Sequence, residues 1–392
     1  MTRSQVTVDP RLHDAVILQV PQSDSANDLV HKLHDAGIQT AVVGSVELDA
    51  ADVREAAQGL GARAERSVVI GTKPDGITAA RNSGVSLVIG VGSSEHAGDL
   101  LEHGADAVIG DLAGIDVRTG DRRMSEIPNA VVSYRAVADV IDGHRPAVCL
   151  DFDGTLSAIV ADPDTARLVD GAAQTLARLA ERCPVAILSG RDLADIRDRV
   201  AVPGLWYAGS HGFESIAPDG SYRQNEEAAA AVPVLARAAA VLREELAHIN
   251  GSRVEHKRFA VAVHYRGVAA ERIGEVVAIA HRVGLRENLR VTSGRKVVEL
   301  RPDVDWNKGT TLVWIRDQIT QAGGKTVLPI FIGDDLTDED AFDAVKADGI
   351  GILVRHTEDG DRRSAAEFTL ESPGQVREFL DRVADDLAAE RA

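Results

Sequence analysis

The chain has few aromatic residues, few cysteines and no long apolar run. Only 4% of its 392 residues are aromatic although 44% are hydrophobic, which suits helices packed on parallel sheets better than an aromatic-rich all-β fold. Its two cysteines, Cys149 and Cys183, exclude a disulfide framework and a cysteine-based zinc site. No apolar stretch approaches the roughly 20 residues of a membrane span, and the N-terminal segment lacks the pattern of a signal peptide. We therefore expect a cytoplasmic protein with no membrane partner.

Basic residues are also in deficit. The chain has 43 Lys and Arg against 61 Asp and Glu, a net charge of -18. This charge repels nucleic acid, so a DNA or RNA partner is not expected. The same field repels a phosphorylated substrate, and a site for one would need local cations or a metal ion.

Strand-like and helix-like segments alternate along most of the chain, which predicts an α/β fold with parallel sheets. At this length two or three domains are expected. A polar stretch separates two α/β regions, and the second region is interrupted by a module with two helices and antiparallel strands. The predicted parts are an N-terminal domain (1–120), a linker (121–145), a core (146–224 and 301–392) and the inserted module (225–300).

The sequence Asp151-Phe152-Asp153-Gly154-Thr155 directly follows an apolar run. Alternate side chains of an extended segment point the same way, so Asp151 and Asp153 can converge on one ligand. Gly154 permits a tight turn, and Thr155 can offer a hydroxyl and an amide to a phosphate oxygen. This pattern is typical of metal-assisted phosphoryl transfer. The alternative is an ordinary Asp-Gly turn after a strand.

Three later segments carry comparable signals. Ser189-Gly190-Arg191 follows an apolar strand and can present a hydroxyl and amides to a phosphoryl group, or simply cap a helix. Lys308 opens a helix and can reach a neighbouring phosphate, or lie on the solvated surface. Asp334 and Asp335 begin a run of five acids in seven residues after another apolar strand, which is more than the capping of a helix requires.

Together these motifs resemble the haloacid dehalogenase superfamily of phosphotransferases. Within it, Gly209-Ser210-His211-Gly212, the stretches 254–257 and 264–266, and residues 296–302 look like the trehalose-6-phosphate phosphatases, over about residues 146–385. The resemblance implies a Rossmann-like haloacid dehalogenase core with an inserted α+β cap. It also implies hydrolysis of trehalose 6-phosphate to trehalose and phosphate, a step of trehalose biosynthesis.

By this resemblance Asp151 is the nucleophile that forms an aspartyl-phosphate, which splits one hydrolysis into two displacements. Asp153 would protonate the departing sugar oxygen and later accept a proton from water. Mg²⁺ prefers oxygen ligands and relieves the repulsion between neighbouring acids. It would be held by Asp151, the main-chain carbonyl of Asp153, and Asp334, with Asp335 as a further ligand or just behind them.

The same resemblance places the transferred phosphate against Lys308, Thr155, Ser189 and Gly190, which oppose its charge. Sugar recognition is expected in the inserted module, because the phosphate chemistry is indifferent to the leaving group. The predicted substrate-binding residues are Arg191, His211, Glu255, Arg266, Arg295, Lys296 and Glu299. Alternatively, those in the module form the solvated charged face of a sheet.

The N-terminal domain resembles the second half of a haloacid dehalogenase core. The run from Gly71 to Gly76, the following helix and the segment from Val88 to Gly92 carry this likeness. No Asp-x-Asp pair follows the opening strand near residues 15–20, so we expect a degenerate copy that kept the fold and lost the chemistry.

Two other functions remain open from the sequence. The chain could act on another sugar phosphate, of the sucrose or glycosyl-glycerate type. It could also be a non-catalytic sugar-phosphate sensor, although the complete acid pair and Lys308 argue against that. The oligomeric state is not determined by the sequence.

Overall fold

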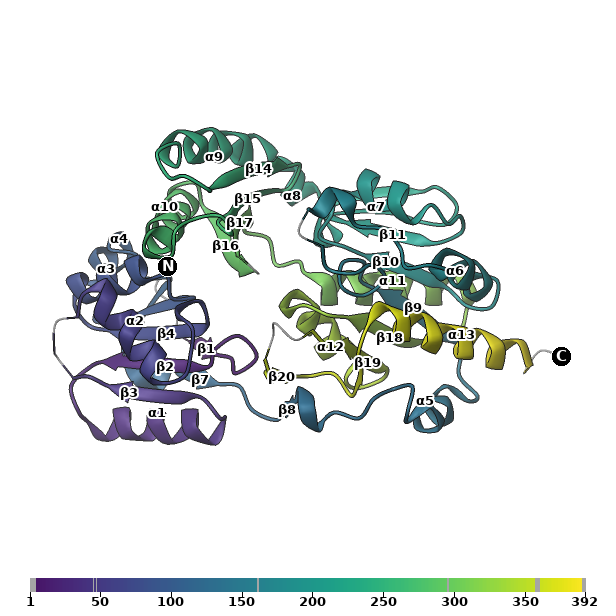
Figure 1. Ribbon diagram of the computed structural model, residues 1–392, viewed down its shortest axis with the longest axis horizontal. Helices are drawn as coiled ribbons and strands as arrows, with labels where there is room; N and C mark the ends of the chain where they lie inside the picture. Colours follow the sequence, from purple (N-terminus) through teal and green to yellow (C-terminus); the bar gives the residue numbers. More distant parts are fainter. Residues whose placement is uncertain are drawn as a thin grey trace. The chain divides into compact units, whose positions relative to one another are not determined.

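A computed structural model describes residues 5–44, 46, 48–160, 162–294, 296–356 and 360–389. The chain forms two units: Met1–Gly120 with Ala231–Asp303, and Asp121–Ala230 with Val304–Ala392. Figure 1 shows the elements of each unit. The second unit contains the predicted core, and the first contains the N-terminal domain together with the inserted module.

The core is built on an eight-stranded sheet whose central strands are parallel. Strands β9 and β18 lie side by side at its centre and are buried along their whole length, as expected for apolar strands covered on both faces. In sheet order the strands are β13 (Tyr222–Gln224), β12 (Glu214–Ile216), β11 (Trp206–Gly209), β10 (Val185–Leu188), β9 (Pro146–Leu150), β18 (Leu328–Gly333), β19 (Ile350–Val354) and β21 (Phe368–Leu370).

Helices cover both faces of this sheet. One face packs on α5 (Tyr134–Ile141), α6 (Ala172–Ala180), α7 (Leu193–Val200) and α13 (Pro373–Ala389), and the other on α11 (Lys308–Gly323) and α12 (Glu339–Val345). The short helix α8 (Glu226–Ala230) ends the first part of the unit. The segment predicted as a linker, 121–145, belongs to this unit, and its strand β8 (Arg122–Arg123) pairs with β20 (Arg363–Ser364).

The N-terminal domain is a five-stranded parallel sheet between two layers of helices. Helix α1 (Asp24–Asp35) covers one face, and α2 (Ala50–Gly59), α3 (Pro74–Ser83) and α4 (Ala97–Glu102) cover the other. In sheet order its strands are β3 (Gln39–Val42), β2 (Ala15–Gln19), β4 (Ser67–Gly71), β5 (Leu87–Val91) and β6 (Ala107–Ile109). A separate parallel pair joins β1 (Val6–Val8) to β7 (Ile115–Val117).

The inserted module, here called the cap, is a four-stranded antiparallel sheet with two helices on one face. The strand order is β14 (Arg253–Lys257), β15 (Ala260–His264), β17 (Val297–Pro302) and β16 (Leu289–Gly294). Helices α9 (Val232–Glu245) and α10 (Ile273–Arg286) pack on the apolar side of the sheet.

The predicted α/β class, with an inserted α+β cap and an additional N-terminal α/β sheet, is confirmed. The individual domain boundaries stay predictions. None of the helices in the described ranges is both long and apolar enough to span a bilayer.

Candidate active site

Two acidic loops meet where β9 and β18 end. Asp151 follows β9, and its N–H donates to the main-chain oxygen of Ile332 in β18, 2.9 Å away. Gly154 has a φ of +80°, and a Cβ there would lie 2.2 Å from Asp334 Oδ2. Only glycine therefore lets the loop after β9 turn this tightly and approach the acid that follows β18.

Three buried carboxylates form one cluster at this edge. Oxygen atoms of Asp151, Asp334 and Asp338 lie within 4.8 Å of one another. Asp338 Oδ2 accepts hydrogen bonds of 2.9 Å from the N–H groups of Asp334 and Asp335, which holds the loop after β18 in place. Asp335 turns its carboxylate to the N–H of Leu336 and caps the short helix Leu336–Asp338. The cluster fits a divalent cation, because hard cations are bound by carboxylate oxygens.

Lys308 supplies the positive charge of the cluster. Its Nζ lies 2.6 Å from Asp338 Oδ1 and 3.1 Å from Asp151 Oδ1, and its side chain is 3% exposed. Burial by itself would lower the pKa of Lys308, but the charges of Asp151 and Asp338 outweigh burial and raise it. Burial raises the pKa of Asp151 well above its usual range; Lys308 opposes this, and Asp338, Asp334 and Asp153 reinforce it.

The local sequence explains how Lys308 reaches the cluster. Asn307 caps helix α11 through a hydrogen bond from Thr310 N–H, so Lys308 occupies the first position of the helix. Trp306 Nε1 donates to the main-chain oxygen of Gly212 at 3.1 Å, and Thr311 Oγ1 to that of His211 at 3.3 Å. These bonds attach the start of α11 to the turn after β11.

Asp153 is held by an arginine. Arg191 Nε and Nη2 each donate to one carboxylate oxygen of Asp153 at 2.7 Å. Arg191 Nη1 also donates to Asp195 Oδ2 at 3.0 Å. A bidentate pair of this kind fixes the orientation of a carboxylate. The structure thus places Arg191 against Asp153, and its predicted contact with the substrate stays a prediction.

The predicted phosphate-binding residues gather on neighbouring loops of the same unit. Thr155 is fully buried, and its Oγ1 has no hydrogen-bond partner among the described residues. Ser189 directly follows β10, and its Oγ accepts from Arg191 N–H at 3.1 Å. Gly190 leaves room for His211, whose Nε2 would lie 2.7 Å from a Cβ at that position. Their roles in binding phosphate and substrate stay predictions.

In the cap, Glu255 and Glu299 lie on one face of the sheet. Glu255 of β14 is opposite Ala262 of β15, which is opposite Glu299 of β17. This is the face away from α9 and α10, because the alternate residues Val261, Val263, Val298 and Leu300 pack on those helices.

Both cap acids are paired with cations. Glu299 is 8% exposed, contacts Arg301, and lies 3.7 Å from Lys257. Burial opposes ionisation of Glu299, but these two cations lower its pKa below the usual value. His264 Nε2 lies 2.7 Å from Glu255 Oε2, and this hydrogen bond is the main reason why the pKa of Glu255 falls to about 2.

The other predicted cap residues are arranged differently. Lys296 has a φ of +61° in the turn between β16 and β17, and its Nζ lies 3.2 Å from Glu65 of the N-terminal domain. Arg266 is exposed, and Arg295 lies outside the described residues. Substrate contacts of these three residues stay predictions.

Sequence analysis did not single out several residues that the structure brings to these places. Asp338 was counted only as a member of the acidic run that begins at Asp334. His356, whose Nε2 lies 3.4 Å from Asp334 Oδ2, follows a strand end, which was the available signal. Lys257 and Arg301 lie two residues after Glu255 and Glu299 in the same strands, so strand periodicity could have indicated them. His264 lies in β15, the strand between those two.

Comparison with known proteins agrees with this geometry. A family model described as trehalose-phosphatase matches residues 149–374. The trehalose-phosphate phosphatase of Mycobacterium tuberculosis (strain ATCC 25618 / H37Rv) is 53% identical over 382 residues, which cover 97% of this chain and 96% of the relative. That of Mycobacterium marinum is 53% identical over 387 residues, covering 98% and 99%.

Two solved structures share the fold. One, a trehalose-6-phosphate phosphatase related protein, has a TM-score of 0.54 at 24% identity and covers 63% of this chain and all of its own, 100%. The other, the C-terminal domain of C. albicans trehalose-6-phosphate phosphatase, has a TM-score of 0.55 at 22% identity and covers 66% and 99%. From the family model and the near full-length relatives, this chain belongs to the trehalose-phosphatase family.

Proposed function

We propose that this protein is a Mg²⁺-dependent phosphoric monoester hydrolase that converts trehalose 6-phosphate to trehalose and phosphate. The observation that carries the proposal is the buried group formed by Asp151, Asp334, Asp338 and Lys308 at the ends of β9 and β18. It lies within a chain that is 53% identical to trehalose-phosphate phosphatases over 97% of its length.

Asp151 is the proposed nucleophile. One of its carboxylate oxygens bonds to phosphorus while the bond from phosphorus to the sugar oxygen breaks, and an aspartyl-phosphate results. Asp153 gives a proton to the departing sugar oxygen. In the second step water attacks phosphorus, Asp153 takes a proton from that water, and the bond to Asp151 breaks.

Neighbouring residues orient Asp151 and Asp153 for the proposed reaction. Arg191 aims the Asp153 carboxylate through two hydrogen bonds of 2.7 Å. Lys308 holds Asp151 in position and opposes the negative charge that the transferred group brings. The Ser189 hydroxyl, the Gly190 amide and Thr155 are the further proposed contacts for the phosphoryl oxygens.

Mg²⁺ is the proposed cofactor. Its proposed ligands are Asp151, the main-chain carbonyl of Asp153, and Asp334, with Asp335 as a further candidate. Asp338 lies in the same cluster but already binds Lys308 and two main-chain N–H groups, which suits a supporting position. When bound, the cation neutralises the carboxylates and polarises the phosphoryl oxygens.

The face of the cap that carries Glu255 and Glu299 is the proposed recognition surface for the sugar. Carboxylates whose positions are fixed by Lys257, Arg301 and His264 are preorganised acceptors for sugar hydroxyls. Arg266, Arg295, Lys296, Arg191 and His211 remain proposed contacts. A cytoplasmic location is proposed because Cys149 and Cys183 are both free and buried, as is usual for thiols in a reducing compartment.

The experiment compares the unmodified chain with Asp151→Asn and with Asp317→Asn, an exposed acid of α11 that serves as the control. Phosphate release from trehalose 6-phosphate should fall by about 10⁴-fold or more in Asp151→Asn, because the nucleophile is lost, and should be unchanged in the control. Equal turnover in Asp151→Asn would overturn the assigned nucleophile.

A panel of sugar phosphates with the unmodified chain tests the substrate. Faster phosphate release from a sucrose or glycosyl-glycerate phosphate than from trehalose 6-phosphate would overturn the proposed substrate. Binding of a sugar phosphate without any phosphate release would favour the sensor.

A further inference from the structure

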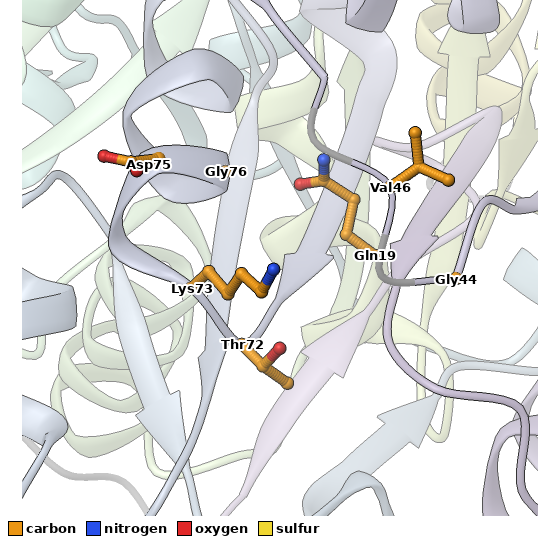
Figure 2. Close-up of a pocket in the computed structure, with 7 residues that line it drawn as sticks. All are labelled: Gln19, Gly44, Val46, Thr72, Lys73, Asp75 and Gly76. Carbon is orange, nitrogen blue, oxygen red and sulfur yellow. The ribbon is translucent and has the colours of Figure 1, made fainter.

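The N-terminal domain contains an open pocket, whose free space is about 310 Å³ when the solvent at its mouth is included. It lies at the carboxyl ends of β2, β3 and β4, and Figure 2 shows the side chains that line it. The lining residues are Gln19, Gly44, Val46, Thr72, Lys73, Asp75 and Gly76. None of them belongs to the candidate active site of the core.

The pocket occupies the same topological position as that active site. In the N-terminal sheet, β2 lies between β3 and β4, and in the core β9 lies between β10 and β18. In each sheet the first of these strands along the chain, β2 or β9, lies in the middle. The next strand along the chain, β3 or β10, lies on one side of it, and a later strand, β4 or β18, lies on the other. Ligands of open α/β sheets bind beside such a reversal of strand order, at the carboxyl ends of the strands.

The strand register identifies the residues that correspond. Gln19 is paired with Gly71, the last residue of β4. Leu150 is paired with Ile332, so the next pair sets Asp151 opposite Gly333, the last residue of β18. Gln19 therefore stands where the core has Asp151.

The residues after these two glycines correspond in turn. Thr72 and Lys73 follow Gly71, and Asp334 and Asp335 follow Gly333. The neutral amide of Gln19 thus stands in place of the Asp151 carboxylate. The Thr72 hydroxyl and the Lys73 amine stand in place of the two acids Asp334 and Asp335. Such a group can bind an anion through a fixed positive charge, but it has no carboxylate at the positions of Asp151, Asp334 and Asp335.

The Gln19 side chain is an independent indication of a ligand. Gln19 is only 6% exposed, and within the described ranges its Oε1 is buried without a hydrogen-bond partner. A buried acceptor without a partner is costly and requires an explanation. Gly76 contributes to the space around it, because a Cβ at residue 76 would lie 2.8 Å from Gln19 Oε1. A hydroxyl group of a bound molecule would satisfy this oxygen.

The charge at the pocket comes from Lys73 and Asp75. Figure 2 shows Lys73 Nζ directed to the side on which Gln19 lies, whereas the Asp75 carboxylate points away from Gln19. Lys73 is also the residue that precedes α3, and its own side chain makes no capping hydrogen bond to that helix. The helix start adds a positive partial charge near Lys73.

We propose that this pocket binds a small hydroxylated anion of the sugar phosphate class and does not hydrolyse it. The phosphate is held by Lys73, Thr72 and the start of α3, and a sugar hydroxyl donates to Gln19 Oε1. This second site is separate from the proposed catalytic function and does not depend on it.

The test uses the full chain with Asp151→Asn, so that no ligand is turned over, and titrates it with glucose 6-phosphate by calorimetry. We compare this chain with versions that also carry Lys73→Ala, Gln19→Leu or the control Lys32→Ala, an exposed lysine of α1. Lys73→Ala should weaken one binding component by about tenfold or more, since a hydrogen bond to a charged group is lost. Lys32→Ala should leave every component unchanged.

A titration with inorganic phosphate distinguishes the proposed phosphate contact of Lys73 from the proposed hydroxyl contact of Gln19. Lys73→Ala should weaken phosphate binding as well, whereas Gln19→Leu should weaken only glucose 6-phosphate. Because Gln19 is buried, thermal unfolding is followed for each variant, and Thr72→Val, at an exposed position, provides a second variant that should weaken both probes.

Identical isotherms for Lys73→Ala and Lys32→Ala would overturn the site. No change for glucose 6-phosphate in a folded Gln19→Leu variant would overturn the hydroxyl contact. Phosphatase turnover of the single variant Lys73→Ala should equal that of the unmodified chain. Unchanged turnover would show that Lys73→Ala affects the second site without affecting the candidate active site.

Discussion

At the scale of single residues, Lys308 and Asp151 form a buried pair of opposite charges. Both side chains are almost fully buried, and Lys308 Nζ lies within 3.1 Å of Asp151 and 2.6 Å of Asp338. Removing one member of such a group leaves uncompensated charge in the interior. Loss of either charge should therefore lower the free energy of unfolding of the protein.

We predict that Lys308→Met lowers the free energy of unfolding by about 3 kcal/mol in the absence of Mg²⁺. Phosphate release should fall by about 10²-fold or more, because a charge that opposes the transferred group is lost. Added Mg²⁺ should restore part of the stability. Chemical denaturation and a phosphate assay measure both effects.

Lys325→Met is the matched control, because Lys325 is an exposed lysine in the loop between α11 and β18. It should alter neither stability nor turnover. A Lys308→Met protein with unchanged stability and rate would show that the charge is not needed.

A second prediction concerns pH and metal removal. The pKa of Asp151 is raised in the folded protein, mainly by burial. The stability that this carboxyl contributes is therefore present below its ordinary pKa of about 3.9 and is lost as the pH rises through the raised value. A cation that binds the ionised form reverses this loss.

Mg²⁺ should accordingly stabilise the protein more at pH 7.5 than at pH 5.5, relative to protein in EDTA, because more of the Asp151 carboxyl is ionised at the higher pH. Thermal unfolding with and without Mg²⁺ measures the difference. In Asp151→Asn the dependence on pH should be reduced. If Mg²⁺ stabilised the unmodified chain and Asp151→Asn with the same dependence on pH, other carboxyl groups would be responsible for that dependence.

At the scale of elements, the cap sheet has one apolar face and one charged face, because side chains alternate along its strands. One face of β15 and β17 packs on α9 and α10, and the opposite face carries Glu299 with Arg301 and Lys257. Since the two faces alternate residue by residue, the polar face can change without disturbing the core of the cap.

We predict that Glu299→Gln raises the KM for trehalose 6-phosphate by about tenfold, because a charged acceptor for a sugar hydroxyl is weakened. Turnover of p-nitrophenyl phosphate, which has no sugar, should be almost unchanged. Glu271→Gln, at an exposed position of the cap, serves as the control. An equal loss with both substrates would indicate a structural role for Glu299.

At the scale of the whole molecule, the N-terminal domain and the cap belong to one unit. Helix α3 packs on α10, where a Cβ at Gly274 would lie only 1.7 Å from the main-chain oxygen of Asn82. A side-chain contact also joins the two parts: Asp106 of the N-terminal domain, which lies 2.6 Å from Arg81 Nη2, is 3.1 Å from Nδ1 of His281 in α10. Close packing and buried charges of this kind oppose separation of the two parts.

We therefore predict that the cap and the N-terminal domain move together when substrate binds. In Asp151→Asn, with trehalose 6-phosphate and Mg²⁺, the distance between labels at Glu244→Cys in the cap and Glu181→Cys in the core should decrease, because closure excludes water from the reaction. The distance between Glu244→Cys and Lys32→Cys in the N-terminal domain should not change. Resonance energy transfer measures both pairs.

The native thiols should not interfere with this labelling. Cys149 and Cys183 are buried, and burial raises the pKa of Cys149 to about 12, which makes it unreactive. A constant distance between the cap and the core would argue against closure. A changed distance within the first unit would show that its two parts move separately.

The sequence alone is enough to predict the α/β class, the inserted cap and the loops that carry the acids. These follow from local patterns: apolar runs of strand length, glycine at a tight turn, and acids directly after buried strands. It also showed that the N-terminal domain lacks an Asp-x-Asp pair after its opening strand.

Which of these residues contact one another is known only from the folded chain. Asp338 rather than Asp335 turns toward Lys308, because the short helix after β18 uses Asp335 as its cap. Arg191 lies against Asp153, Lys296 against Glu65, and Gln19 at the position that corresponds to Asp151. Each of these contacts joins residues far apart in the chain or depends on strand register, and neither distance nor register is encoded in a local pattern.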